Sequence, residues 1–357
     1  MFNKRKTIAS IVLGSVLFLN VNMHIAERNR ILQDHRQLTK ALEGGGCTIT
    51  PVSEYVTPSE DTPRTLLTSY PGSGKRFTWL VISALTNYDV ADDWNFSGKL
   101  YENVLTLKTS WPHADSVWSW DNQMDQTILL LRNPRWAIPS YHAMRYELDF
   151  SDDWASSLVR IPYIYTGRPS VELWEAWRDE NFETELDAYI DHIDYWMDGG
   201  KNTVTGEIDS ECADNKIDCR PKTVLDFDTF YKENPDTEFY KLSQILDGAY
   251  TNETSVELLA TQARVCALDK VYDTSELRHN NFRNGEGKPL APEFRFTSAQ
   301  LQLMEDKLVE TRNKYVMRMT AQGQLESELV LILNRYIASV TMQKNHEAAI
   351  EAEEATA

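Results

Sequence analysis

The segment TLLTSYPGSGKRFTWL, residues 65–80, gives the clearest indication of the fold class. Its start, TLLTSY (65–70), is a short apolar run typical of a buried strand, and FTWLVISAL (77–85) has the pattern of a helix. Further strands are expected at 103–110, 127–133 and 222–230, and further helices at 136–148, 171–197, 236–247, 253–268 and 297–320. Short apolar strands that alternate with helices predict an α/β fold, in which a central parallel sheet is flanked by helices.

The turn between the first strand and the first helix is a candidate phosphate cradle. It contains Gly72, Ser73 and Gly74, and the cations Lys75 and Arg76 follow directly. Successive backbone N–H groups at such a turn, together with the start of the next helix, attract an anion. The sequence therefore predicts that an anionic ligand binds here.

Charge excludes several classes of partner. The 357 residues include 54 acidic and 36 basic side chains, which gives a formal net charge of −18 and a pI near 4.9. General binding to nucleic acid or to an anionic membrane surface needs a basic field, which this chain lacks. An anionic ligand must therefore meet a local basic cluster.

The N-terminus predicts a membrane anchor. Three cations lie within residues 2–6, and residues 7–23 carry no charge. As a helix that uncharged stretch would be roughly 25 Å long, at the lower limit for crossing a bilayer. The positive-inside rule predicts a cytosolic tail (1–6) and a lumenal remainder, as in a single-pass type II protein of the Golgi or endoplasmic reticulum. A cleaved signal peptide is the alternative.

Other features agree with a lumenal location. Residues 24–62 contain glycines and prolines typical of a stem or linker. Two Asn-x-Ser/Thr sequons begin at Asn95 and Asn252. Cys212 and Cys219 lie in one polar loop and can form a disulfide in an oxidising compartment, or remain two free thiols.

Three segments resemble sulfotransferases that use 3′-phosphoadenosine 5′-phosphosulfate. SYPGSG followed by Thr78-Trp79 resembles the family's 5′-phosphosulfate loop, usually Tyr-Pro-x-Ser-Gly-(Thr/Asn)-Thr-Trp. LLLRNPRWAIPSY resembles the 3′-phosphate motif, with Arg132 and Ser140 at the matching positions. In VLDFDTFYKENPDTEF, Phe227 stands where a later family motif has Tyr. The segments follow one another in family order.

The resemblance implies a P-loop-like sulfotransferase domain over residues 63–320. It implies transfer of a sulfuryl group from that donor to a hydroxyl or amine, with no metal required. Because membrane-anchored members usually act on glycans or secreted proteins, a carbohydrate or protein acceptor is expected. The implied donor-binding residues are Gly72, Ser73, Gly74, Lys75, Arg76, Thr78, Arg132, Ser140, Phe227 and Arg283.

The catalytic residues depart from the family pattern. TLKTSWPH resembles the family's Lys-Thr-His-x-Pro, in which the Lys contacts the transferring group and the His is the general base. Lys108 is kept, but Ser110 replaces the His, and a serine is a poor base at neutral pH. His113 is the nearest substitute. Glu102, Asp115 and an acidic residue from another segment remain open.

The glycine turn and the late basic loop also depart. Gly72 stands where the family commonly has Lys, so Lys75 or Arg76 is expected to supply that charge, and Lys75 is a candidate catalytic residue. The loop around Arg283 resembles in position the family's late basic loop, but it lacks the usual Arg-Lys-Gly.

Two other functions remain open. A nucleotide kinase or ATPase would need G-x-x-x-x-G-K-[ST], but Ser69 takes the first glycine position and Arg76 the hydroxyl position. A noncatalytic glycan-binding or scaffold protein of the same fold would explain Ser110.

Residues 321–357 predict an amphipathic C-terminal helix followed by an acidic tail. Apolar residues between Leu325 and Val340 follow helical spacing, which indicates either core packing or a contact between copies in a homo-oligomer. In the helix expected at 171–197, Trp174 and Trp177 lie three residues apart, and we assign both to the core.

Overall fold

The computed structural model describes residues 58–59, 62–86, 88–93, 104–116, 124–147, 169–213, 219–230, 235–246 and 295–356. The expected anchor (7–23), most of the stem, both sequons and the helix expected at 253–268 lie outside the described residues. Within the described ranges, no helix is both long enough and apolar enough to cross a membrane.

Five strands form one parallel sheet in the order β2-β3-β1-β4-β5. The strands are β1 (Thr65–Thr68), β2 (Asp89–Asp92), β3 (Val104–Thr109), β4 (Gln126–Leu131) and β5 (Pro221–Asp226). The helices are α2 (Lys75–Thr86), α3 (Pro134–Glu147), α5 (Val171–Met197), α6 (Ser210–Ala213), α7 (Pro235–Leu246), α10 (Ser298–Gln322) and α11 (Gln324–Glu354). The predicted α/β class is confirmed.

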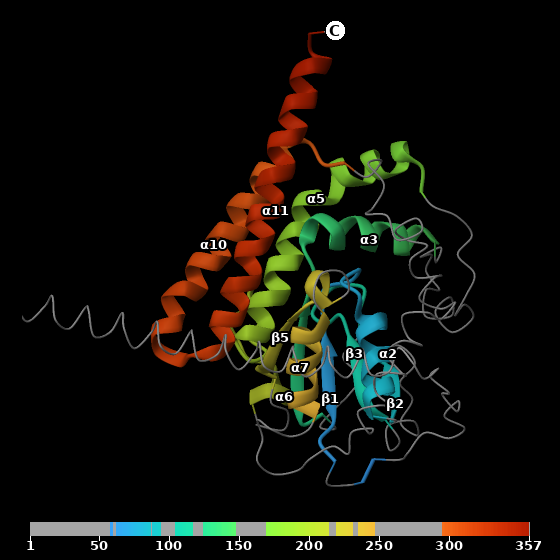
Figure 1. Cartoon of the computed structure of the whole chain (residues 1–357), viewed down its shortest axis with the longest axis vertical. Helices are drawn as coiled ribbons and strands as arrows, with labels where there is room; N and C mark the ends of the chain where they lie inside the picture. Colours follow the sequence, from blue (N-terminus) through green and yellow to red (C-terminus); the bar gives the residue numbers. More distant parts are fainter. Residues whose placement is uncertain are drawn as a thin grey trace, which may run out of the picture.

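Helices cover both faces of the sheet (Figure 1). Side chains of neighbouring strand residues point to opposite faces, so Leu66 of β1 packs with α3, α5, α10 and α11, whereas Leu67 packs with α2 and α7. Leu129 and Leu130 of β4 divide between the two layers in the same way. This alternation explains why the strands are apolar throughout.

The strand expected at 222–230 ends earlier, at Asp226. The Asp226 carboxylate accepts hydrogen bonds from the Asp228 N–H (3.1 Å) and the Thr229 hydroxyl (2.8 Å). Such side-chain bonds to the next residues favour a helical turn over an extended chain. The chain therefore turns at residues 227–230, directly beyond the edge of the sheet.

The long helices α10 and α11 lie side by side along α5 (Figure 1). Trp174 of α5 is fully buried, as expected of a core residue. In α11, Leu329, Leu333 and Val340 are buried within the chain's own core. The expected acidic tail is instead helical to Glu354. In that part of α11, Glu347 accepts from Arg295 and Glu351 accepts from the Ser298 N–H at the start of α10.

The structure confirms a disulfide between Cys212 and Cys219, whose Cα atoms are 5.6 Å apart. Gly200 packs against it: a Cβ at that position would lie 2.2 Å from the Cys212 Sγ. The bond joins α6 to the residue two positions before β5.

Candidate anion-binding site at the strand ends

The carboxyl ends of the strands meet at one edge of the sheet because all five strands are parallel. In the sheet, β1 and β4 are neighbours. The next strand after β1 in the chain is β2, at one edge of the sheet, whereas the next strand after β4 is β5, at the opposite edge. Adjacent strands whose connections leave in opposite directions open a ligand-binding crevice. The glycine turn follows β1 and Arg132 follows β4, so both border this crevice.

Two glycines shape the turn. Gly72 and Gly74 have φ angles of 80° and 88°, in the left-handed region that favours glycine. A Cβ on Gly72 would lie 2.4 Å from the carbonyl oxygen of Ala137, and one on Gly74 would lie 2.1 Å from the Phe227 ring. The turn is therefore packed between α3 and the chain that follows β5.

Arg132 connects the two sides of the crevice. Its Nη1 donates to the carbonyl oxygen of Gly72 at 2.7 Å, and its guanidinium lies 5.1 Å from the centroid of the Phe227 ring. The Tyr189 hydroxyl donates to the Arg132 carbonyl at 2.8 Å. Ser140 is buried on α3, directly against the Gly72 position. Residues of three separate sequence motifs are thus brought together.

Two lysines extend the site toward β3. The Lys75 Nζ donates to the Ser69 carbonyl oxygen at 3.3 Å and contacts the Ser110 hydroxyl. The Lys108 Nζ lies 4.5 Å from the centroid of the Trp79 ring. Lys75 thus links the start of α2 to the end of β3.

Two buried donors of the turn and α2 have no protein partner in the described part of the chain: the Ser73 hydroxyl and the Trp79 indole N–H. Buried donors are normally satisfied, so this arrangement fits a site that receives acceptor oxygens from a ligand. Thr78 differs, because its hydroxyl donates within the helix to the Gly74 carbonyl oxygen at 3.5 Å. Arg76 is half-buried in the first turn of α2.

His113 is buried and bonded through both ring nitrogens. Its Nδ1 accepts from the Asp115 N–H at 3.1 Å, and its Nε2 lies 3.3 Å from the Glu185 Oε2. This pattern assigns the proton to Nε2. The Tyr70 hydroxyl donates to the same Glu185 oxygen at 2.6 Å. Burial, and then the Glu185 charge, raise the pKa of Tyr70 well above its usual value.

Glu185 was not singled out in the sequence, although a signal was present. It lies on the inward stripe of α5 with Phe182 and Tyr189, and all three are buried. An acidic residue in an otherwise apolar stripe indicates a buried polar contact. The identity of that contact depends on His113, which lies 72 residues away.

A second imidazole, His192, lies behind the site. Its Nε2 is 3.2 Å from the Thr68 hydroxyl oxygen. Burial lowers the pKa of His192 well below its usual value, and the charge of Lys75 lowers it further. Because His192 is neutral, Lys75 provides the positive charge in this part of the site.

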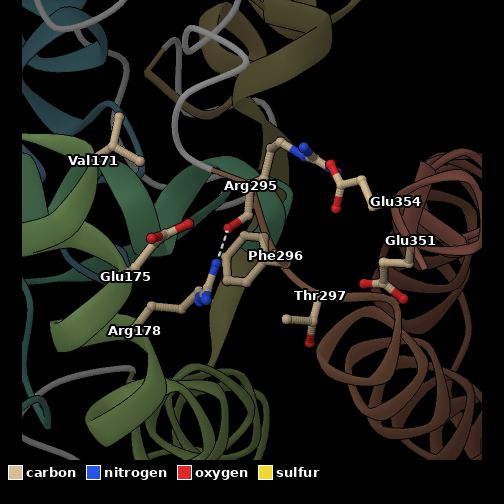
Figure 2. A pocket seen from close by; sticks show the side chains of 8 residues that line it. All are labelled: Val171, Glu175, Arg178, Arg295, Phe296, Thr297, Glu351 and Glu354. Atoms are coloured by element: carbon tan, nitrogen blue, oxygen red, sulfur yellow. Dashed lines mark hydrogen bonds between the residues drawn. The ribbon is translucent and has the colours of Figure 1, made fainter. Parts of the chain in front are cut away.

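Two surface pockets lie elsewhere. One, of about 570 Å³, lies between α5, residues 295–297 and the end of α11 (Figure 2). Its Arg178 is held by Asp179 and by the Arg295 carbonyl oxygen, and Arg295 is paired with Glu347. The other, of about 850 Å³, lies between α5 and α10. Neither contains an expected site residue, and acidic side chains outnumber basic ones in both linings, so neither suits an anionic donor.

Arg283 and Glu102 lie outside the described residues. Within the described ranges, no group of three or more His, Cys, Asp or Glu side chains could hold a metal ion.

Comparison of the chain with family models, curated proteins and solved structures gave no match. The function must therefore be inferred from this chain's own residues.

Proposed function

We propose that the protein is a sulfotransferase that moves a sulfuryl group from 3′-phosphoadenosine 5′-phosphosulfate to a hydroxyl or amine. One observation carries the proposal: the glycine turn, Arg132 and Phe227 come from three distant segments and meet at the crevice between β1 and β4. Each of these three features belongs to a sequence motif that resembles a motif of the sulfotransferase family. The Ser73 hydroxyl, which has no partner among the described residues, adds a donor suited to a phosphate oxygen.

The two ends of the donor are assigned to different strands. The turn after β1, with Ser73 and the N-terminus of α2, would hold the 5′-phosphosulfate. Arg132 after β4 and Ser140 on α3 would hold the 3′-phosphate. Lys75 and Lys108 would stabilise the charge that develops on the leaving 5′-phosphate and on the sulfuryl oxygens. In the reaction, the S–O bond to that phosphate breaks, a bond from the acceptor to sulfur forms, and the acceptor loses a proton.

Glu185 is the base that the geometry favours. In the tautomer assigned above, His113 has no free lone pair, because Nδ1 accepts from Asp115 and Nε2 donates to Glu185. Glu185 receives bonds from Tyr70 and His113 on Oε2, and its side chain is 11% exposed, so it remains accessible to an acceptor. His113 would then orient the carboxylate and stabilise its charge.

The acceptor is proposed to be a carbohydrate or protein of the secretory pathway. This part of the proposal depends on residues 1–23, which suggest a single-pass type II protein of the Golgi or endoplasmic reticulum. The disulfide between Cys212 and Cys219 is compatible with such an oxidising compartment.

Calorimetric titration of the full-length protein in detergent micelles tests the proposal. The ligands are 3′-phosphoadenosine 5′-phosphate and, separately, ATP with magnesium. Binding of the first ligand alone would support the proposal, provided that Arg132→Ala weakens it at least tenfold. The control Arg312→Ala, which removes a contact between α10 and Asn334 of α11, should leave the affinity unchanged. Preference for magnesium-ATP would support the kinase alternative. Donor binding without desulfation over a broad acceptor panel would support the noncatalytic alternative, which Ser110 favours.

A further inference from the structure

Arg135, in the first turn of α3, is half-buried and has no carboxylate partner among the residues that the structure describes. Its Nη1 donates to the Gln343 Oε1 at 2.8 Å, and its guanidinium lies 4.3 Å from the centroid of the Trp136 ring. Its buried Nε has no hydrogen-bond partner in the described ranges. Among the described residues, a carboxylate pairs with each of several other arginines, including Arg145, Arg178, Arg220, Arg295, Arg318 and Arg335.

Such an arrangement is unfavourable unless an anion binds. Partial removal of a guanidinium from water costs free energy unless a bonded counter-charge offsets the loss. Burial lowers the pKa of Arg135, and the charge of Asp228 opposes that shift only in part. The chain has 54 acidic residues, so acidic side chains are abundant, yet an amide rather than a carboxylate faces Arg135. The charge of this guanidinium therefore remains available to a ligand.

Arg135 lies in the first turn of α3, which follows β4, one of the two strands that border the crevice. Asn133 caps the start of α3, because its Oδ1 accepts from the Arg135 N–H at 3.1 Å. The Asn133 N–H in turn donates to the Asp228 Oδ2 at 3.0 Å, beyond the end of β5. Arg135 thus follows Arg132 by three residues, at the positive end of a helix that adds to the attraction for an anion.

Gln343 of α11 is held so that its oxygen faces Arg135. Its Nε2 donates to the Glu347 Oε1 at 2.6 Å, which fixes the orientation of the amide. Glu347 is buried, and its Oε2 accepts from the Arg295 Nε at 2.7 Å. Gln343 can therefore orient the guanidinium without neutralising it, although 208 residues separate it from Arg135.

We propose that Arg135 is a further donor-binding residue, that Gln343 positions it, and that the group it binds is the 3′-phosphate. This inference rests on the proposed function. The 3′-phosphate is favoured because Arg135 lies on α3 and follows β4, as Ser140 and Arg132 do, whereas the 5′-phosphosulfate is assigned to the turn after β1. On this view α11, near the C-terminus, is part of the donor-binding machinery.

The test compares two nucleotides that differ only in the 3′-phosphate: 3′-phosphoadenosine 5′-phosphate and adenosine 5′-phosphate. Calorimetry uses the full-length wild type, Arg135→Gln, Gln343→Glu and the control Arg312→Gln. Because hydrogen bonds to charged groups contribute strongly, Arg135→Gln should weaken bisphosphate binding roughly ten- to a hundredfold and leave monophosphate binding within about twofold. Gln343→Glu should act in the same direction, since the new carboxylate would neutralise Arg135. Arg312→Gln should change neither affinity.

The outcomes separate this inference from the function on which it rests. If the wild type prefers the bisphosphate and both variants keep that preference, Arg135 does not bind the 3′-phosphate. An equal loss for both nucleotides would also overturn the inference, because it would indicate a general distortion of the site. If the wild type binds neither nucleotide, the proposed function itself fails, and the inference with it. Circular dichroism verifies the fold of each variant, and Gln343→Glu carries the test if Arg135→Gln does not fold.

Discussion

The Nη1 of Arg132 lies 2.7 Å from the carbonyl oxygen of Gly72, a residue 60 positions earlier in the chain. This bond links the end of β4 to the turn after β1 across the crevice. The same arginine therefore shapes the turn and supplies a charge to it. Because the two strands are adjacent and parallel, the segments that follow them meet at this edge of the sheet.

Gly72→Ala should destabilise the protein by about 2–4 kcal/mol, because a positive φ and a steric clash with the backbone of α3 combine. Gly206→Ala is the matched control, since Gly206 also has a positive φ, 72°, but a Cβ there would meet no atom within 4 Å. The free energy of unfolding should fall by only about 1 kcal/mol in Gly206→Ala. Urea unfolding of both variants measures the difference, and equal losses would contradict the close packing of the turn.

Glu185→Gln should reduce desulfation of the donor about a hundredfold or more, because an amide cannot accept the acceptor's proton. Affinity for 3′-phosphoadenosine 5′-phosphate should change less than about twofold. Glu175→Gln, an exposed change on the same helix, is the control and should affect neither property. Full turnover by Glu185→Gln, over a panel of carbohydrate and protein acceptors, would exclude Glu185 as the base.

Stability should fall between pH 6.5 and pH 4 in part because of His142. Burial lowers the pKa of His142 from its usual 6.5 to about 4, and the Arg145 charge adds to this shift. Within that window the unfolded chain binds a proton that the folded chain excludes, so stability decreases as the pH falls. His142→Phe should flatten this part of the curve. Urea unfolding at pH 7.5, 6 and 5 gives the measurement, and an unchanged slope would show that His142 is not responsible.

Tyr336→Phe should cost about 1–3 kcal/mol, because it removes a donor from a buried carboxylate. The Tyr336 hydroxyl donates to the Asp226 Oδ1 at 2.7 Å, and Arg335 pairs with the other oxygen at 2.7 Å. Tyr240→Phe, at an exposed position on α7, should change the free energy of unfolding by less than about 0.5 kcal/mol. Comparable losses in the two variants would mean that the bond to Asp226 does not anchor α11.

Much of the fold could be predicted from local sequence. The apolar runs at 65–70, 103–110 and 127–133 correspond to three central strands, because strands buried on both faces must be apolar throughout. By contrast, β2 was missed. It is a four-residue edge strand that begins and ends with Asp, and it pairs on one side only. Its short, polar sequence therefore carries little strand signal.

Elements with a local signal could be predicted from the sequence: the glycine turn, the helices that follow it, the placement of Trp174 in the core, and two cysteines close enough to pair. Which distant side chains meet depends on the tertiary structure. Glu185 contacts His113, and Gln343 contacts Arg135, because long helices pack across the ends of strands far away in the chain. Periodicity determines which face of a helix is buried, but the partners on that face depend on how all the layers pack together.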